Sequence, residues 1–134
     1  MARTASEHAL RTRLALPYEE AVQAVVNVLK DEGFGVLTEV DVRATLKKKL
    51  DADFRKYVIM GVCNPQLAHQ ALKTDLSIGL LLPCNVVVYE EGGESVVAFL
   101  DPISMLGVVE NPSLVPVAEE ARKRLKRAID SLGA

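Results

Sequence analysis

Apolar and polar residues alternate along several short segments of the chain, and a period of two predicts β-strands. In residues 7–16 this pattern places Leu10 and Leu14 on one face and Arg11 and Arg13 on the other. We therefore expect a strand with one face in contact with solvent. The alternation, together with two longer apolar runs, predicts five strands: 7–16, 35–42, 54–63, 79–90 and 95–101.

Between these strands, apolar residues recur at helical spacing. Pro17 suits the first turn of a helix that ends at Gly33, and Asn64 followed by Pro65 is typical of an N-cap and a first-turn proline. A shorter helical segment has consecutive lysines at 47–49, which indicates a solvated face. Helices are expected at 17–33, 44–50, 66–75 and 112–132.

The order of these elements predicts the fold class. Residues 91–94, Glu-Gly-Gly-Glu, are typical of a hairpin loop between the last two strands. The order lacks the repeated strand–helix–strand period of a doubly wound sheet. We therefore expect an α+β fold, a single domain over residues 1–134 with a mainly antiparallel sheet packed by helices.

Two of the predicted strands, 54–63 and 79–90, are apolar on both faces. Helices that collect on one face of an antiparallel sheet leave the other face uncovered. We therefore infer a homodimer, with a face or an edge of the sheet as the contact between the two copies.

Length and composition narrow the range of functions. The chain has 134 residues, of which 49% are hydrophobic and 25% charged, as in ordinary globular domains. A net charge of −2 disfavours a nucleic-acid partner. No apolar run is long enough for a membrane span, and no secretory signal follows the first residues, so we expect a cytoplasmic protein with reduced cysteines.

Several familiar catalytic motifs are absent from the sequence. There is no GxxxxGK[ST], GxGxxG, HExxH, CxxC or GxSxG, so the common phosphate, dinucleotide, zinc-protease and serine-hydrolase mechanisms lose their support. The chain has two histidines, His8 and His69, too few for a three-histidine metal site. These absences favour a protein that is not an enzyme.

Two cysteines carry the remaining candidate chemistry. Cys63 ends one predicted strand directly before a helix, whose N-terminus is expected to lower the pKa of the thiol. Cys84 interrupts another strand between Pro83 and Asn85. If the two strands are neighbours, the thiols approach each other. The resulting candidate binding site consists of Cys63, Asn64, Pro65, His69, Pro83 and Cys84.

Three interpretations of this site stay open. The first is a binding module that is not an enzyme and that holds a small molecule or a soft metal ion near Cys63 and Cys84. Two thiolates and an imidazole suit copper or zinc, with Cys63, Cys84 and His69 as ligands and Met105 as a weak fourth. In the second interpretation, Cys63 is a redox-active nucleophile, with His69 as its base and Asp75 or Asp101 as the group that orients this base. Cys84 is then the resolving thiol. In the third interpretation, both cysteines are packed core and the protein has a structural or interaction role.

Two further features bear on a site. Gly61 leaves a hollow on its strand, which suits either a closely packed helix or a small ligand. The apolar segment 102–112 is suited to cap the core or to act as a lid over a ligand.

Two motifs resemble those of a known family: Cys63-Asn64-Pro65, with Ala68 following, and Leu-Leu-Pro-Cys-Asn-Val at 81–86. The likeness extends to residues 17–21, 33–34, 39–42 and 101–105, so that it covers roughly residues 14–129. On these residues the sequence resembles the family known as domain of unknown function 302. The resemblance implies a small bacterial or archaeal α+β protein with a TBP-like sheet-and-helix arrangement, often a homodimer, with no assigned activity.

Overall fold

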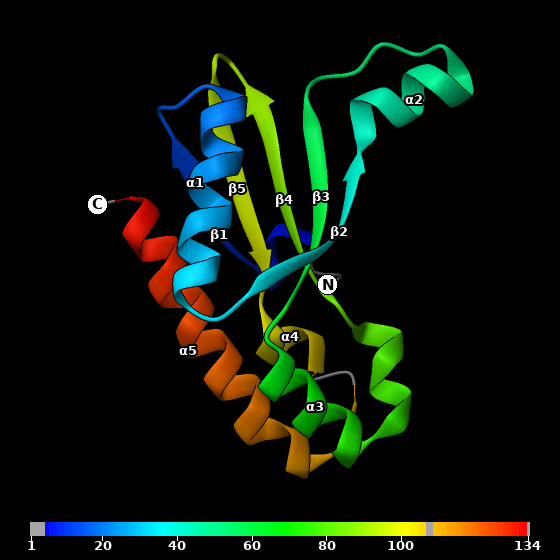
Figure 1. Cartoon of the computed structure of the whole chain (residues 1–134), viewed down its shortest axis with the longest axis vertical. Helices are drawn as coiled ribbons and strands as arrows, with labels where there is room; N and C mark the ends of the chain where they lie inside the picture. Colours follow the sequence, from blue (N-terminus) through cyan, green and yellow to red (C-terminus); the bar gives the residue numbers. More distant parts are fainter. Residues whose placement is uncertain (1–4, 107–108, 134) are drawn as a thin grey trace.

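Five strands form one antiparallel sheet in the order β1-β5-β4-β3-β2. The structure is a computed structural model that describes residues 5–106 and 109–133. The α+β expectation is confirmed, including the hairpin between the last two strands (Figure 1). The strands are β1 (Ala9–Leu14), β2 (Gly35–Asp41), β3 (Tyr57–Cys63), β4 (Cys84–Glu91) and β5 (Glu94–Leu100).

Helices occupy most of the connections between the strands. Asp41 and Asn64, which precede the second and third helices, each accept a hydrogen bond from a backbone N–H of the first turn and so act as N-caps. The helices are α1 (Tyr18–Asp31), α2 (Val42–Leu50), α3 (Pro65–Thr74), α4 (Pro102–Leu106) and α5 (Val115–Leu132), with 3-10 segments η1 (Ala5–His8), η2 (Leu76–Leu81) and η3 (Pro112–Leu114).

The main core lies between one face of the sheet and helices α1 and α5. Alternate residues of β3, namely Val58, Met60 and Val62, are buried there, and the ladder places Met60 opposite Val86 of β4. Leu29 of α1 belongs to the same hydrophobic cluster. The period of two in the sequence therefore marks the side of each strand that faces these helices.

The opposite face of the sheet has a different character. Tyr57 and Tyr89 stack across β3 and β4 with ring centroids 5.1 Å apart, and Arg11 donates a hydrogen bond to the Tyr89 hydroxyl. Ile59 and Val87, on the same side, are only partly buried. The expectation that both faces of these two strands carry apolar side chains is confirmed.

A second, smaller hydrophobic cluster lies beyond the end of the sheet. It joins α3, η2, η3 and the start of α5 through the buried residues Ala71, Ile78, Leu114 and Ala118. Figure 1 shows these elements gathered below the strands, with α4 beside them. The last residue of β3, Cys63, and the first residue of β4, Cys84, lie at the boundary between the two hydrophobic clusters.

The predicted strand 79–90 is wrong in its first part. Residues 76–81 form η2, and β4 begins only at Cys84, after a cis peptide bond between Leu82 and Pro83. The side chain of Asp75 accepts a hydrogen bond from the backbone N–H of Ser77, which starts this 3-10 turn. An apolar run alone does not distinguish a buried strand from a short helical segment.

The hollow at Gly61 holds neither a helix nor a ligand. A Cβ at this position would lie 2.3 Å from Thr38 Oγ1 and 2.6 Å from Pro83 Cγ. The side chains of Thr38 and Pro83 therefore fill the space, and Gly61 is required because a larger residue would overlap with both.

Residues 35–56, which we call the arm, project from the edge of the sheet. The arm consists of β2, α2 and the connection to β3 (Figure 1). Its base is held by the β2–β3 ladder, which contains a bulge between Val36 and Thr38. None of the 22 residues of the arm is buried. We call the other described residues, 5–34, 57–106 and 109–133, the body.

Candidate functional site

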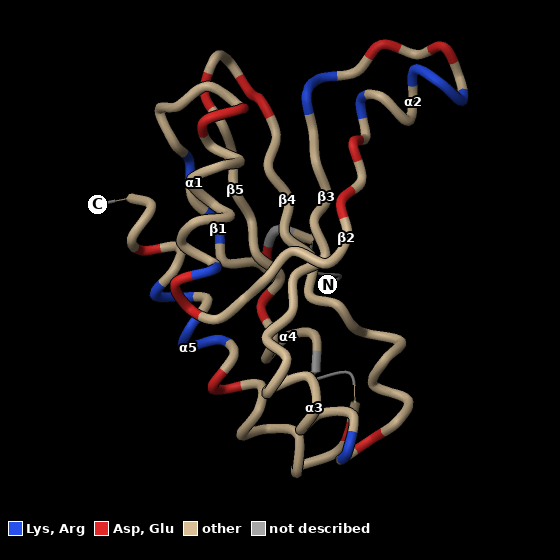
Figure 2. Tube along the Cα trace, viewed as in Figure 1, with Lys and Arg blue, Asp and Glu red and all other residues tan. Residues whose placement is uncertain are grey.

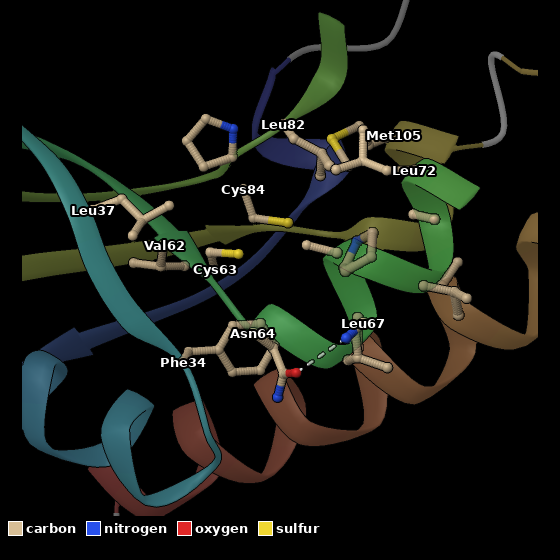
Figure 3. Close-up of a pocket in the computed structure, with 17 residues that line it drawn as sticks. Phe34, Leu37, Val62, Cys63, Asn64, Leu67, Leu72, Leu82, Cys84 and Met105 are labelled. Atoms are coloured by element: carbon tan, nitrogen blue, oxygen red, sulfur yellow. Dashed lines mark hydrogen bonds between the residues drawn. The ribbon is translucent and has the colours of Figure 1, made fainter. Parts of the chain in front are cut away.

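The two cysteines lie at the ends of neighbouring strands and line one cavity. Cys84 pairs with Val62 in the β3–β4 ladder, and Cys63 is the next residue of β3. The cavity has a volume of about 290 Å³ and lies between the ends of these strands and helices α3, α4 and α5 (Figure 3). The condition under which the two thiols approach each other, that their strands are neighbours, is therefore met. The cavity is lined by Phe34, Leu37, Val62, Cys63, Asn64, Leu67, Ala68, Ala71, Leu72, Leu82, Pro83, Cys84, Pro102, Met105, Val117, Ala118 and Ala121.

The wall of this cavity is almost entirely apolar. None of the described lining residues carries a charge, and the single amide among them, Asn64, is used in the fold. Its Oδ1 accepts a hydrogen bond from the Leu67 N–H at 3.2 Å, which caps α3 as the sequence predicts. Pro65, by contrast, is exposed and outside the lining. The cavity is therefore suited to apolar contacts, with few polar groups to orient a ligand.

The expected low pKa of Cys63 is wrong. Cys63 does lie directly before Asn64, the N-cap of α3, but burial against apolar side chains raises the pKa of its thiol. Burial, and then the neighbouring Cys63, raise the pKa of Cys84 to about 11. Burial disfavours the charged thiolate form, and this raises the pKa of a thiol. Both thiols are accordingly protonated and weakly nucleophilic at neutral pH.

His69 does not join the cysteines. It lies on α3, exposed to solvent, and is not part of the cavity wall. Asp75 and Asp101 have other partners: Asp75 caps η2, and Asp101 Oδ2 accepts a hydrogen bond from Arg122 Nε at 3.0 Å. The base and the orienting carboxylate expected beside Cys63 are thus not assembled there.

The expected metal ligands are only partly brought together. Across residues 5–106 and 109–133, no group of three His, Cys, Asp or Glu side chains is placed to share a metal ion. Met105 of α4, however, lines the cavity with Cys63 and Cys84. The donor set that the structure does assemble contains three sulfur atoms and no imidazole.

The segment after Asp101 forms a wall of the cavity. Pro102 is buried and Met105 partly buried, and both line the cavity. This agrees with a cap of the core. The part of the predicted lid at 107–108 lies outside the described residues.

Most of the apolar lining could not be found from the sequence. Phe34 and Leu37 flank the start of β2, Leu72 belongs to α3, and Val117 belongs to α5. These positions read as ordinary core or surface residues, because the cavity exists only where their elements meet. The one available signal was the pair of prolines, Pro83 and Pro102, at strand boundaries.

Fold and site together define a class: an α+β protein with one helix-covered sheet face and an apolar cavity at the adjoining ends of strands β3 and β4. Within this class, the family described as "Domain of unknown function DUF302" matches residues 10–132. The chain belongs to this family.

A solved structure supports the same assignment. The crystal structure of an uncharacterized conserved protein DUF302 from Bacillus stearothermophilus is similar to this chain with a TM-score of 0.85 and 34% identity. The similarity covers 92% of this chain and 96% of that one. Among curated proteins, none matches. Within the described ranges, every helix is too short or too polar to cross a membrane.

Proposed function

We propose that this protein is a binding module whose ligand is a small, neutral, mainly apolar molecule held in the cavity beside Cys63 and Cys84. One observation supports the proposal above others. The wall of the cavity brings two protonated thiols together with aliphatic side chains from five elements, with no charge among the described residues. Such a wall favours an uncharged ligand, since an ion would lose its hydration without a partner.

The volume narrows the class of ligand. Small-molecule sites commonly have volumes of roughly 300–1,000 Å³, and about 290 Å³ is at the lower end of that range. A nucleotide or another large charged cofactor is a poor fit in both size and charge. An aliphatic or small aromatic compound, with at most one polar group near the opening, fits both.

A soft metal ion is the second candidate. The sulfur atoms of Cys63, Cys84 and Met105 belong to one wall, and thiolate and thioether ligands favour monovalent copper over zinc. A metal would have to displace the thiol protons, which the raised pKa of Cys84 opposes. A thiol-dependent redox role is disfavoured by the same raised pKa.

We also infer that the module acts as a cytoplasmic homodimer. The support is the sheet face that carries Tyr57, Ile59, Val87 and Tyr89, whose side chains are only partly buried within one copy. Apolar surface of this kind is typical of a contact with another chain.

A binding experiment with a matched pair of variants tests the cavity. The small neutral dye N-phenyl-1-naphthylamine is titrated into the protein, and medium-length alcohols, such as decanol, are used to displace it. Ala68→Phe places a ring in the cavity wall, whereas Gln70→Phe adds the same ring to the exposed side of the same helix. We expect Ala68→Phe to weaken binding at least tenfold and Gln70→Phe to leave it unchanged.

Two outcomes contradict the proposal. One is the absence of binding by any neutral apolar probe at 100 µM or below. The other is equal binding by wild type and Ala68→Phe, since the dye then lies elsewhere. Native mass spectrometry with added monovalent copper decides the second candidate: a single bound copper that Met105→Leu and Cys84→Ser both remove would favour the metal.

A further inference from the structure

Leu37 differs from the other residues that line the cavity. Its side chain is 65% exposed, whereas every other described lining residue is buried or partly buried. A residue that is in contact with both the solvent and a cavity lies where the cavity opens. Leu37 belongs to the arm, and the other described lining residues belong to the body. The arm therefore contributes one apolar side chain at the opening of the cavity.

The β-bulge at the base of the arm places Leu37 at this opening. The ladder pairs Val36 with Val62 and Thr38 with Gly61. Leu37 is left between these pairs as an extra residue of β2. Bulges re-aim side chains and are frequent next to functional sites. The sheet does not need the extra residue, because the pairs on the two sides of the bulge would form one continuous ladder without it.

The side chain of Leu37 can move while the strand stays in place. The backbone is held by ladder pairs on both sides of the bulge, but β2 is an edge strand, and exposed side chains change rotamer within picoseconds to nanoseconds. Figure 3 shows Leu37 and Leu72 on opposite sides of the two cysteines. Figure 2 shows no Lys, Arg, Asp or Glu in the stretch of β2 that carries Leu37. A change of rotamer at Leu37 therefore alters the width of the opening and places no charge there.

We propose that Leu37 is the gate of the cavity: its side chain covers the opening and controls how fast a neutral apolar ligand enters and leaves. This rests on the proposed function, because it concerns the ligand of the same cavity. An apolar ligand stabilises the closed position of the gate, since contact between the two removes apolar surface of both from water. Without a ligand, the leucine gains no such contact and stays largely in the solvent.

A gate differs from an ordinary contact residue in its effect on the kinetics of binding. Truncating a contact residue weakens the bound state and mainly raises the dissociation rate constant. Truncating a gate lowers the barrier in both directions, so the association and dissociation rate constants rise together. The two rate constants therefore separate the two roles, whereas the dissociation constant alone does not.

Stopped-flow fluorescence with N-phenyl-1-naphthylamine and the full-length chain measures both rate constants, and an excess of decanol starts the dissociation. We expect Leu37→Ala to raise both at least fivefold and Leu37→Trp to lower both at least fivefold. The matched control is Leu72→Ala, the same truncation at a partly buried position of the opposite wall, which is expected to raise only the dissociation rate constant. Val40→Ala, exposed on the same strand but outside the lining, is expected to change neither.

Deletion of Leu37 tests the role of the bulge. The deletion joins the two sets of ladder pairs, so we expect the variant to fold, as checked by circular dichroism, and to exchange the dye at least as fast as Leu37→Ala. A folded deletion variant with wild-type rate constants overturns the proposal. If the deletion variant does not fold, Leu37→Ala and Leu37→Trp decide the question, because they keep the length of the strand.

The outcomes separate the gate from the binding site itself. If the dye does not bind, or binds wild type and Ala68→Phe equally, the proposed function fails and the gate fails with it. If the dye binds in the cavity but Leu37→Ala changes neither rate constant, or only that of dissociation, the gate is overturned and the binding module stands. If Leu72→Ala raises both rate constants and Leu37→Ala does not, the opening lies beside α3, which also overturns the gate at Leu37.

Discussion

The arm and the body are built from the same kinds of element, but they obtain their stability differently. In the body, helices α1 and α5 bury one stripe each against the sheet, and Leu29 and Leu125 are almost fully inaccessible. In the arm, local signals dominate: Asp41 accepts a hydrogen bond from the Ala44 N–H, and the β2–β3 ladder fixes the strand. The difference teaches that capping and pairing specify a backbone path without providing a core.

The largest expected contrast comes from truncating one leucine in each region. Leu29→Ala removes a fully buried side chain from α1 and is expected to lower the free energy of unfolding by about 2–5 kcal/mol. Leu50→Ala, at an exposed position in α2, is expected to change it by less than about 0.5 kcal/mol at low protein concentration. Urea unfolding measures both.

Protein concentration sharpens the same comparison. The comparison is made at low concentration because association of copies adds to the stability of any residue that it covers, whereas the effect of Leu29→Ala is large at every concentration. Equal losses for the two variants at low concentration would mean that the arm is stabilised within one copy, and the contrast would fail.

The next effect compares two strand glycines. Gly61→Ala brings a Cβ to 2.3 Å from Thr38 Oγ1 and is expected to cost about 1–3 kcal/mol of stability. Gly35→Ala, at the first residue of the arm, meets no atom within 4 Å and is expected to be neutral or slightly stabilising. The measurement is the urea concentration at the midpoint of unfolding, provided that the slope of the unfolding free energy against urea is the same as in wild type. A neutral Gly61→Ala would show that Thr38 and Pro83 move aside freely.

The smallest expected effect is a pH dependence of the free energy of unfolding, which arises from a cysteine in the body. Because burial raises the pKa of Cys84 from 9 to about 11, the folded state holds this proton longer than the unfolded state. Its contribution to stability is complete below pH 9 and is lost as the pH rises towards 11. We expect a loss of about 1–2 kcal/mol over this interval, which the difference between wild type and Cys84→Ala isolates. If the free energy of unfolding falls equally with pH in wild type and in Cys84→Ala, this result contradicts the raised pKa of Cys84.

Much of the fold could be predicted from the sequence, because local chemistry determines it. Each of the signals that succeeded determines structure over a short stretch of chain. They are the turn at Gly92-Gly93, the first-turn proline of α3 and the apolar stripe of α5. The 3-10 segment η2 was not predicted. Its apolar residues resemble a strand, and two features separate the two structures: the cap that Asp75 provides for the Ser77 N–H, and the burial of Ile78 against α3 and α5.

The sequence predicted which sulfur atoms belong to the site, but not the side chains that surround them. The sequence indicated that the thiols would approach each other if their strands were neighbours, and β3 and β4 are paired. It did not indicate that Cys84 begins its strand, because the residues before it were predicted as part of that strand. The pKa of Cys63 depended on how many apolar side chains from distant elements would surround it, which no local pattern contains. His69 was placed on the wrong side of α3 for the same reason, since the orientation of that helix follows from packing Leu67 and Ala71 inward.

The missing side chain at Gly61 has a mechanical consequence. Thr38 belongs to the arm and Pro83 to the wall of the cavity, and both reach to within 2.6 Å of the point that a Cβ of Gly61 would occupy. The packing of the cavity wall and the packing of the arm are therefore coupled at Gly61, in addition to the β2–β3 ladder and to Leu37, an arm residue that itself lines the cavity.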